Sequence, residues 1–255
     1  MAVKSRRSKI FNKIFEEREI NASYVPMNVR EDDIFFTISN LKDSQLKGVN
    51  IGIMYKKEVC NHLKENTSFA SISDEAKIVN FVDSVKIQDS KLYGFVTVGE
   101  ALVKTLEQNN FNSESKIAIL GSGSLTKSLI LNLKKMGIKN ITLAKNSIES
   151  IPKMLEEISE FTEDINFEIE RVAEFMPLNG SKYDLIINAT PFGQFAHDEF
   201  TFIKEMNSNL TLLDFKESES GSFFKKLADE NQVKYIGRDE IAQNSSEIDL
   251  KVWLS

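Results

Sequence analysis

The stretch Lys116–Asn146 reads KIAILGSGSLTKSLILNLKKMGIKNITLAKN, and it decides the fold of this chain. Its opening, KIAIL, is a short apolar run typical of a buried parallel strand. Gly121-Ser122-Gly123 follows at once and predicts a tight turn whose bare backbone a pyrophosphate can approach. Leucines then recur at helical spacing up to Gly137, and the apolar run ITLA comes next. We therefore expect a strand, glycine loop, helix and strand that together hold a dinucleotide.

The glycine loop has the pattern GxGxxT, with Thr126 where glycine or alanine would allow close packing of helix on strand. Ser124 opens the helix, whose free N–H groups and positive dipole end would face the phosphates. A purely structural turn of the same shape is the alternative interpretation, because glycine pairs occur in many α/β proteins. The surrounding strand and helix pattern favours the dinucleotide site.

The residues after the second strand bear on the choice of cofactor. An NAD site usually places an acid about 20 residues beyond the glycines, where it holds the ribose hydroxyls. That place holds Lys145, Asn146 and Ser147, with no carboxylate before Glu149. A lysine and small polar groups suit a 2′-phosphate, so the sequence predicts NADP (NADPH) as cofactor, with NAD less favoured. A solvated loop lysine is the alternative reading of Lys145.

Composition limits the other classes of function. The chain has 255 residues, of which 41% are hydrophobic and 27% charged, as is ordinary for a globular protein of one or two domains. A net charge of −6 argues against nucleic-acid or anionic-membrane partners. Cys60 is the single cysteine, and His62 and His197 are the only histidines, so neither a disulfide nor a cysteine- or histidine-based metal site is expected. Without a membrane-length apolar run or a signal core, we expect a cytoplasmic location.

Apolar periodicity predicts strands that alternate with helices, hence an α/β architecture with parallel sheets. The expected helices cover residues 8–20, 31–43, 58–66, 151–161, 222–231 and 239–253. The expected strands cover 24–29, 49–54, 79–87, 92–95, 166–170, 184–188, 210–214 and 233–236. Thr97 and Glu100 have the spacing of a capping box that would start a further helix.

Several segments together carry a resemblance to one family. KGVNIGIMYKKEV at 47–59 is similar to its GxNVTxPxK segment, VNFV at 79–82 to VNT, and KLYGFVTVG at 91–99 to LxGxNTDG. GSGSLTKS at 121–128 is similar to GAGGAAR, and DLIINATPFG at 184–193 to DLIINATPxG. On these residues the chain resembles shikimate dehydrogenases along nearly its whole length.

The resemblance implies reduction of 3-dehydroshikimate to shikimate with NADPH, a step of aromatic amino acid biosynthesis. It implies a substrate-binding α/β domain over 1–96, a Rossmann-type NAD(P)-binding domain with a doubly wound parallel sheet over 97–225, and a segment 226–255 that packs back on the first domain. A small-molecule substrate and a monomer or homodimer are expected. The resemblance assigns catalysis to Lys56, substrate binding to Ser5, Asn50, Asn80 and Gln243, and cofactor binding to Gly121, Ser122, Gly123, Ser124, Lys145, Asn146, Ser147, Asn188, Ala189 and Thr190.

The chain departs from the family pattern where polar groups would hold the substrate. Val98 stands in place of the aspartate that works with the lysine, so Lys56 is expected to lack its carboxylate partner. Gly52, Met54 and Val96 replace a threonine, a proline and an asparagine, and Glu217 aligns loosely with a tyrosine. At the start of the chain, Ser5, Arg7 and Asn12 lie at the places of the SxSPxxHN segment, without its preceding strand.

These departures leave two hypotheses. One is an NADP(H)-dependent oxidoreductase with weakened or altered activity on shikimate, 3-dehydroshikimate or a related small hydroxy acid. The other is a non-catalytic relative that keeps the fold and binds a nucleotide or small ligand. An acid that reaches Lys56 in the folded protein would favour the first.

Overall fold

The structure is a computed structural model that describes residues 5–173, 175–190, 202–215 and 222–255. The chain divides into two compact units, Met1–Ala101 with Ala242–Ser255, and Leu102–Ile241. Residues 97–101 therefore lie with the first unit and 226–241 with the second, which differs from the expected boundaries. The second difference arises because the strand at 234–236 pairs within the large parallel sheet of the second unit.

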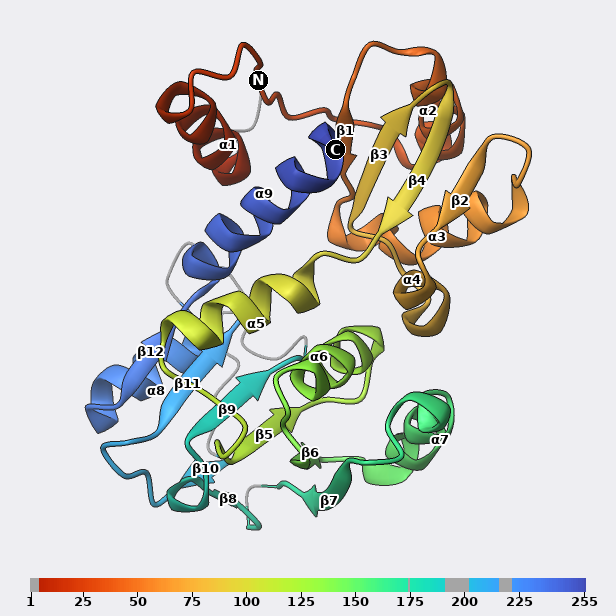
Figure 1. Ribbon diagram of the computed structural model, residues 1–255. Coiled ribbons are helices and arrows are strands. Elements are labelled where there is room, and N and C mark those ends of the chain that lie inside the picture. Colours follow the sequence, from red (N-terminus) through yellow and green to blue (C-terminus); the bar gives the residue numbers. More distant parts are fainter. Residues whose placement is uncertain (1–4, 174, 191–201, 216–221) are drawn as a thin grey trace. The chain divides into compact units, whose positions relative to one another are not determined.

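The first unit is built on a four-stranded sheet with the order β1-β3-β4-β2 (Figure 1). Its elements in chain order are α1 (Arg6–Glu17), the 3-10 turn η1 (Glu31–Asp33), α2 (Ile34–Asn40), η2 (Leu41–Asp43), β1 (Gly48–Asn50), η3 (Ile53–Tyr55), α3 (Lys56–Glu65), β2 (Ala70–Ile72), α4 (Asp74–Val79), β3 (Ser84–Gln88) and β4 (Lys91–Phe95). Helix α9 (Arg238–Leu254) closes the chain, and its residues from Ala242 on belong to this unit.

The small sheet is mixed, so the expectation of parallel pairing is wrong here. Strand β3 pairs antiparallel with both β1 and β4, and only β2 and β4 are parallel. Asp89 and Ser90 make the turn between β3 and β4 with φ of 51° and 56°. A two-residue turn with both φ values positive matches the twist of antiparallel strands and forces them together.

Two expected strands of the first unit are also corrected. Residues 24–29 join no sheet, and their Tyr24 instead stacks on Phe11 of α1 with ring centroids 4.4 Å apart. The expected strand over 79–87 divides, because α4 ends at Val79 and Asn80 takes a left-handed conformation before β3 begins. An apolar core of α2, α3 and the sheet fixes these elements, with Val59, Leu63 and Leu92 fully buried.

The second unit has a six-stranded sheet in which every pairing is parallel. Its elements are α5 (Val98–Gln108, which begins in the first unit), β5 (Ile117–Leu120), α6 (Ser124–Lys135), β6 (Asn140–Lys145), η4 (Ile148–Ser150), α7 (Ile151–Glu156), η5 (Ser159–Phe161), β7 (Asn166–Arg171), β8 (Leu178–Asn179), η6 (Gly180–Lys182), β9 (Leu185–Asn188), β10 (Ile203–Lys204), β11 (Thr211–Asp214), α8 (Phe223–Asn231) and β12 (Lys234–Ile236). Strands β8 and β10 pair separately.

The strand order of the large sheet, β12-β11-β9-β5-β6-β7, confirms the expected doubly wound domain (Figure 1). From β5 the chain moves outward to β6 and β7, and then returns to the other side of β5 with β9, β11 and β12. The order thus reverses between β5 and β9. In sheets of this kind the ligand binds beyond the carboxyl ends of the strands at that reversal point.

Helix α6 is buried along most of its length, including its polar residues Thr126, Lys127 and Ser128. The Lys127 ammonium is satisfied by Glu157, with Nζ 3.0 Å from Oε2. Thr126 is different, because its fully buried Oγ1 has no hydrogen-bond partner within the described part of the chain. A buried hydroxyl without a partner costs free energy.

Replacing Thr126 with valine should therefore raise the free energy of unfolding by about 1 kcal/mol, because the shape is kept and an unpaired hydroxyl is removed. Urea unfolding followed by circular dichroism measures the change. Thr162→Val is the matched control, since the buried Thr162 Oγ1 donates to the Ile158 carbonyl at 3.0 Å and its loss should destabilise. Equal destabilisation of both variants would contradict the prediction.

Candidate functional site

Lys56 is the first residue of α3, and its side chain is held by the segment that leads into β3. Its Nζ lies 3.8 Å from Oδ2 of Asp83 and 5.4 Å from the centroid of the Phe81 ring. The Lys56 carbonyl accepts the Val82 N–H at 3.1 Å. The Lys56 side chain is 26% exposed to solvent, whereas the Asp83 side chain is only 3% exposed. The result is a partly accessible cation beside a buried carboxylate.

Asp83 is fixed by the start of helix α5. Its Oδ1 accepts the Thr97 N–H at 2.8 Å and the Thr97 hydroxyl at 3.1 Å, and its Oδ2 accepts the Val98 N–H at 3.2 Å. The carboxylate thus caps free amide groups at a helix N-terminus, where negative charge is favoured. The expected capping box is wrong, because Asp83 rather than Glu100 accepts the Thr97 amide hydrogen.

A second buried carboxylate, Asp249 of α9, lies behind Thr97. Its Oδ1 lies 3.0 Å from Thr97 Oγ1, whose single hydrogen is shared between the Asp83 and Asp249 carboxylates, and its Oδ2 accepts hydrogen bonds from Arg7 Nη1 at 2.9 Å and Asn50 Nδ2 at 2.8 Å. The hydroxyl of Tyr24 donates to Asn50 Oδ1 at 3.2 Å. A chain of contacts therefore runs through Lys56, Asp83, Thr97, Asp249 and Arg7. It has a cation at each end, then a carboxylate, and one hydroxyl between the two carboxylates.

The electrostatics of Asp249 follow from its complete burial. Burial raises the pKa of Asp249 above its usual value, the Arg7 guanidinium lowers it, and the nearby Asp83 charge raises it. Hydrogen bonds from Asn50 and Ser84 lower it as well. Arg7 is therefore the main group that keeps this carboxylate compatible with the interior.

The remaining predicted substrate residues lie at helix ends or on α9. Ser5 caps α1 by accepting the Ser8 N–H at 3.4 Å. Asn80 caps the end of α4, and its Oδ1 accepts Lys64 Nζ at 2.7 Å. Gln243 is exposed on α9. Of the four predicted residues, Asn50 makes a direct hydrogen bond to a residue of the Lys56–Arg7 chain, namely Asp249.

The predicted cofactor residues gather at the carboxyl ends of β5, β6 and β9. Gly121 has φ of +119°, and a Cβ there would lie 3.2 Å from the Ala189 carbonyl oxygen and from Thr190 Cγ2. A side chain is thus excluded by conformation and by space. A Cβ on Gly123, which precedes α6, would meet no atom within 4 Å. This bare, open backbone at a helix N-terminus fits a phosphate.

Lys145, at the end of β6, reaches back over the glycine loop. Its Nζ donates to Ser122 Oγ at 2.9 Å and to Ser150 Oγ at 2.7 Å. Arg171, the last residue of β7, is its direct neighbour in the sheet register. A hydrogen bond from Ser147 lowers the pKa of Glu149, and the Arg171 and Lys145 charges lower it further. Two cations and three serine hydroxyls therefore lie at this end of the sheet.

The Asn188-Ala189-Thr190 segment follows β9, next to the glycine loop. Asn188 Oδ1 accepts the Thr190 N–H at 3.1 Å and its hydroxyl at 2.7 Å, and the Ala189 N–H donates to the Leu120 carbonyl at 2.9 Å. Asn188 therefore shapes the turn, while the backbone of Ala189 closes on Gly121. The residues 191–193 of the same motif, and Glu217, lie outside the described residues.

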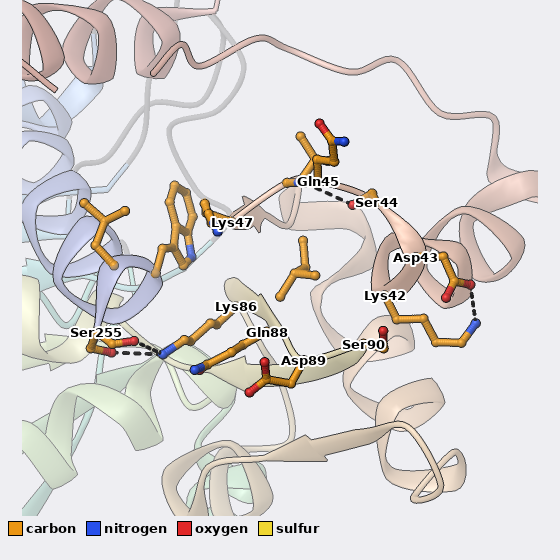
Figure 2. A pocket seen from close by; sticks show the side chains of 14 residues that line it. Lys42, Asp43, Ser44, Gln45, Lys47, Lys86, Gln88, Asp89, Ser90 and Ser255 are labelled. Atoms are coloured by element: carbon orange, nitrogen blue, oxygen red, sulfur yellow. Dashed lines mark hydrogen bonds and ion pairs between the residues drawn. The ribbon is translucent and has the colours of Figure 1, made fainter. Parts of the chain in front are cut away.

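A further hollow of about 610 Å³ lies in the first unit (Figure 2). It is lined by the turns before β1 and after β3 and by the end of α9, and Lys86 donates there to the carbonyl of Ser255. None of the predicted site residues lines it. In the described part of the chain no group of three acidic, histidine or cysteine side chains could hold a metal, and no helix has the length and apolar character needed to span a membrane.

Sequence reasoning missed Asp83, Asp249 and Arg171. Asp83 has a recognisable signal, since it is an isolated acid within an apolar pattern, and acids are almost never fully buried without partners. Asp249 lacks this signal, because Glu247 and Lys251 lie close to it in the sequence. Arg171 shows no such signal, because only the strand register places it beside Lys145.

Comparison with known proteins agrees with this architecture. Residues 2–82 match the family model described as the shikimate dehydrogenase substrate binding domain. The shikimate dehydrogenase (NADP(+)) of Clostridium beijerinckii is 28% identical over 236 residues, which cover 91% of this chain and 81% of that protein. The chain is thus similar to shikimate dehydrogenases over most of its length.

Solved structures share its fold. A ligand-free 5-ketofructose reductase of Gluconobacter has a TM-score of 0.82 and 18% identity, over 99% of this chain and 89% of that one. A shikimate dehydrogenase in complex with NADP+ has a TM-score of 0.79 and 22% identity, over 98% and 85% of the two chains. Against the pattern of shikimate dehydrogenases, this chain has valine at position 98 and a different acid, Asp83, beside Lys56.

The Arg7–Asp249 pair should stabilise the first unit. Arg7→Met leaves a buried carboxylate without its cation and should lower the free energy of unfolding by about 3 kcal/mol at pH 7. The variant raises the folded-state pKa of Asp249 further above the unfolded value, so folding gains a proton and the loss should shrink as the pH falls toward the unfolded pKa.

Urea unfolding at pH 7 and at mildly acidic pH measures this loss. Arg18→Met is the control, because Arg18 pairs at 3.4 Å with Glu247 of the same helix α9 but is 51% exposed. Its removal should cost less than about 1 kcal/mol. A loss for Arg7→Met that is equally small would contradict the prediction.

Proposed function

We propose that this protein is an NADP(H)-dependent oxidoreductase that interconverts a carbonyl and a hydroxyl group on shikimate, 3-dehydroshikimate or a related small hydroxy acid. The observation that carries the proposal is the arrangement at the reversal point of the large sheet. There Gly121 excludes a side chain against the Ala189 carbonyl, while Lys145 and Arg171 end neighbouring strands. A bound nicotinamide dinucleotide phosphate would supply or accept the hydride.

The hydrogen-bond donors and cations at the sheet edge suit the phosphate groups of such a cofactor. The open backbone at Gly123 and the first N–H groups of α6 suit the pyrophosphate. Lys145, Arg171 and the serine hydroxyls suit a 2′-phosphate, which takes charge-assisted hydrogen bonds from cations. The relative from Clostridium beijerinckii is named for NADP(+), and one structural neighbour was solved with NADP+.

The first unit supplies the group that handles the proton. Reduction of a carbonyl leaves charge on its oxygen, and an ammonium within reach stabilises that charge and donates a proton. Lys56 holds such a proton at Nζ and remains partly accessible. In the opposite direction the neutral amine would accept the proton from the substrate hydroxyl. Solvent returns the amine to its starting state.

A non-catalytic relative that binds a nucleotide or small ligand is the second candidate. Val98, which has no carboxylate, favours it. Substrate tests should include shikimate, other small hydroxy acids and 5-ketofructose, because the structural neighbour with the TM-score of 0.82 is a 5-ketofructose reductase. Nucleotide binding without turnover of any of these substrates would support the second candidate.

We also propose a cytoplasmic protein that is monomeric or homodimeric, as the resemblance implies, and its net charge of −6 supports the absence of nucleic-acid and anionic-membrane partners. Sedimentation of the purified protein would test the oligomeric state.

The cofactor proposal predicts tighter binding of NADPH than of NADH. Lys145→Ala should weaken NADPH binding about tenfold and leave NADH binding nearly unchanged, because it removes one charge-assisted contact to the 2′-phosphate. Isothermal titration calorimetry measures both ligands.

Arg171→Ala should act in the same way as Lys145→Ala. Lys153→Ala, on the exposed face of α7, is the control and should change neither affinity. Equal affinities of the wild type for NADPH and NADH would contradict the NADP assignment, and no heat with either would sink the dinucleotide proposal altogether.

A further inference from the structure

We infer that Asp83 is the carboxylate partner of Lys56 and replaces the acid that this chain lacks at Val98. In this role, which rests on the proposed function, Asp83 is a positioning residue: it orients the Lys56 ammonium and keeps it charged. In the family pattern the acid stands at the start of α5, whereas here it is the residue before β3. Its carboxylate nevertheless lies beside the backbone of position 98.

The position of the Asp83 carboxylate carries this inference. Its Oδ2 accepts the backbone N–H of Val98 at 3.2 Å and lies 3.8 Å from Lys56 Nζ. The carboxylate is thus hydrogen-bonded to the very residue whose side chain lacks an acid. The side chain of the residue that precedes β3 therefore places negative charge next to the backbone of position 98.

Rigid support makes Asp83 suitable for orienting another group. Three hydrogen bonds from Thr97 and Val98 fix both carboxylate oxygens, and only 3% of the side chain is exposed. Lys56 is restrained as well, by the Phe81 ring and by its carbonyl bond to Val82. A fixed acid next to a restrained cation defines the direction of the ammonium far better than a solvated pair does.

Lys56 is the cation that pairs with Asp83. The other carboxylate, Asp249, is bonded to Arg7 and Asn50, and the Thr97 hydroxyl lies between it and Asp83. Each acid thus has its own cation. The simpler alternative is that Asp83 only caps α5, with the lysine nearby by chance, and the experiment must separate these two roles.

The first measurement does not require activity. Wild type and Asp83→Asn are treated with limiting acetic anhydride at constant pH, and acetylation of Lys56 is quantified by mass spectrometry relative to the exposed neighbour Lys57. Only the neutral amine reacts, so loss of the paired carboxylate should raise the Lys56 to Lys57 ratio about two- to fivefold. Adding Val98→Asp to the Asp83→Asn variant should return the ratio toward the wild-type value.

The second measurement is turnover with the substrate that the panel identifies. Asp83→Asn should lower kcat about 100-fold with little change in KM, because the proton donor loses its orientation. The added Val98→Asp should recover most of kcat, whereas Lys57→Met should leave it unchanged. Thermal melting of each variant shows whether the helix cap is also weakened.

The outcomes are distinguishable. If Asp83 only caps α5, Asp83→Asn lowers the melting temperature without changing the Lys56 to Lys57 ratio, and Val98→Asp rescues nothing; either result overturns the inference. If the wild type turns over no substrate, the proposed function fails. The acetylation ratio then still decides whether Asp83 pairs with Lys56.

Discussion

The burial of the Asp83 carboxylate is the constraint on which the first unit depends. A carboxylate in the protein interior is tolerated only when donors surround it. Here those donors are backbone N–H groups at the start of α5 and one threonine hydroxyl, and the Lys56 ammonium lies 3.8 Å away as an ion-pair partner. Satisfying Asp83 therefore fixes where α5 begins, how the end of β4 meets β3 and where the first residue of α3 points. Local structure and candidate chemistry share one cause.

The second unit depends on its backbone conformation rather than on a buried charge. Its sheet reverses order between β5 and β9, and the space beyond that point must stay free of side chains. Gly121 provides this by its positive φ and its close approach to Ala189. Lys145 and Arg171, the cations at the ends of β6 and β7, favour a negatively charged ligand in this open space. The first unit thus carries the Lys56 ammonium, and the second unit carries cations at the edge of its sheet that suit an anion.

Local pattern predicted much of this architecture. The glycine loop, the parallel strands and most helix positions follow from apolar periodicity, because each depends on residues close in sequence. The small sheet was harder, since antiparallel pairing of β3 with β4 depends on two non-glycine residues with positive φ at the turn. Lys56 and the cofactor loop could be proposed from motifs. The apolar surroundings of Asp83 indicate a buried acid, but its partners, like those of Asp249 and Arg171, are set by tertiary packing and strand register and could not be predicted.

Arg7 and Asp249 are separated by 242 positions in the sequence, yet both belong to the first unit. The whole of the second unit lies between them in the chain. Contacts that close so long a loop form late in folding and slow it. During synthesis the large parallel sheet can therefore fold while the small unit still lacks α9. The Arg7–Asp249 pair, which lies behind the lysine site, can therefore form only after the second unit has been synthesised.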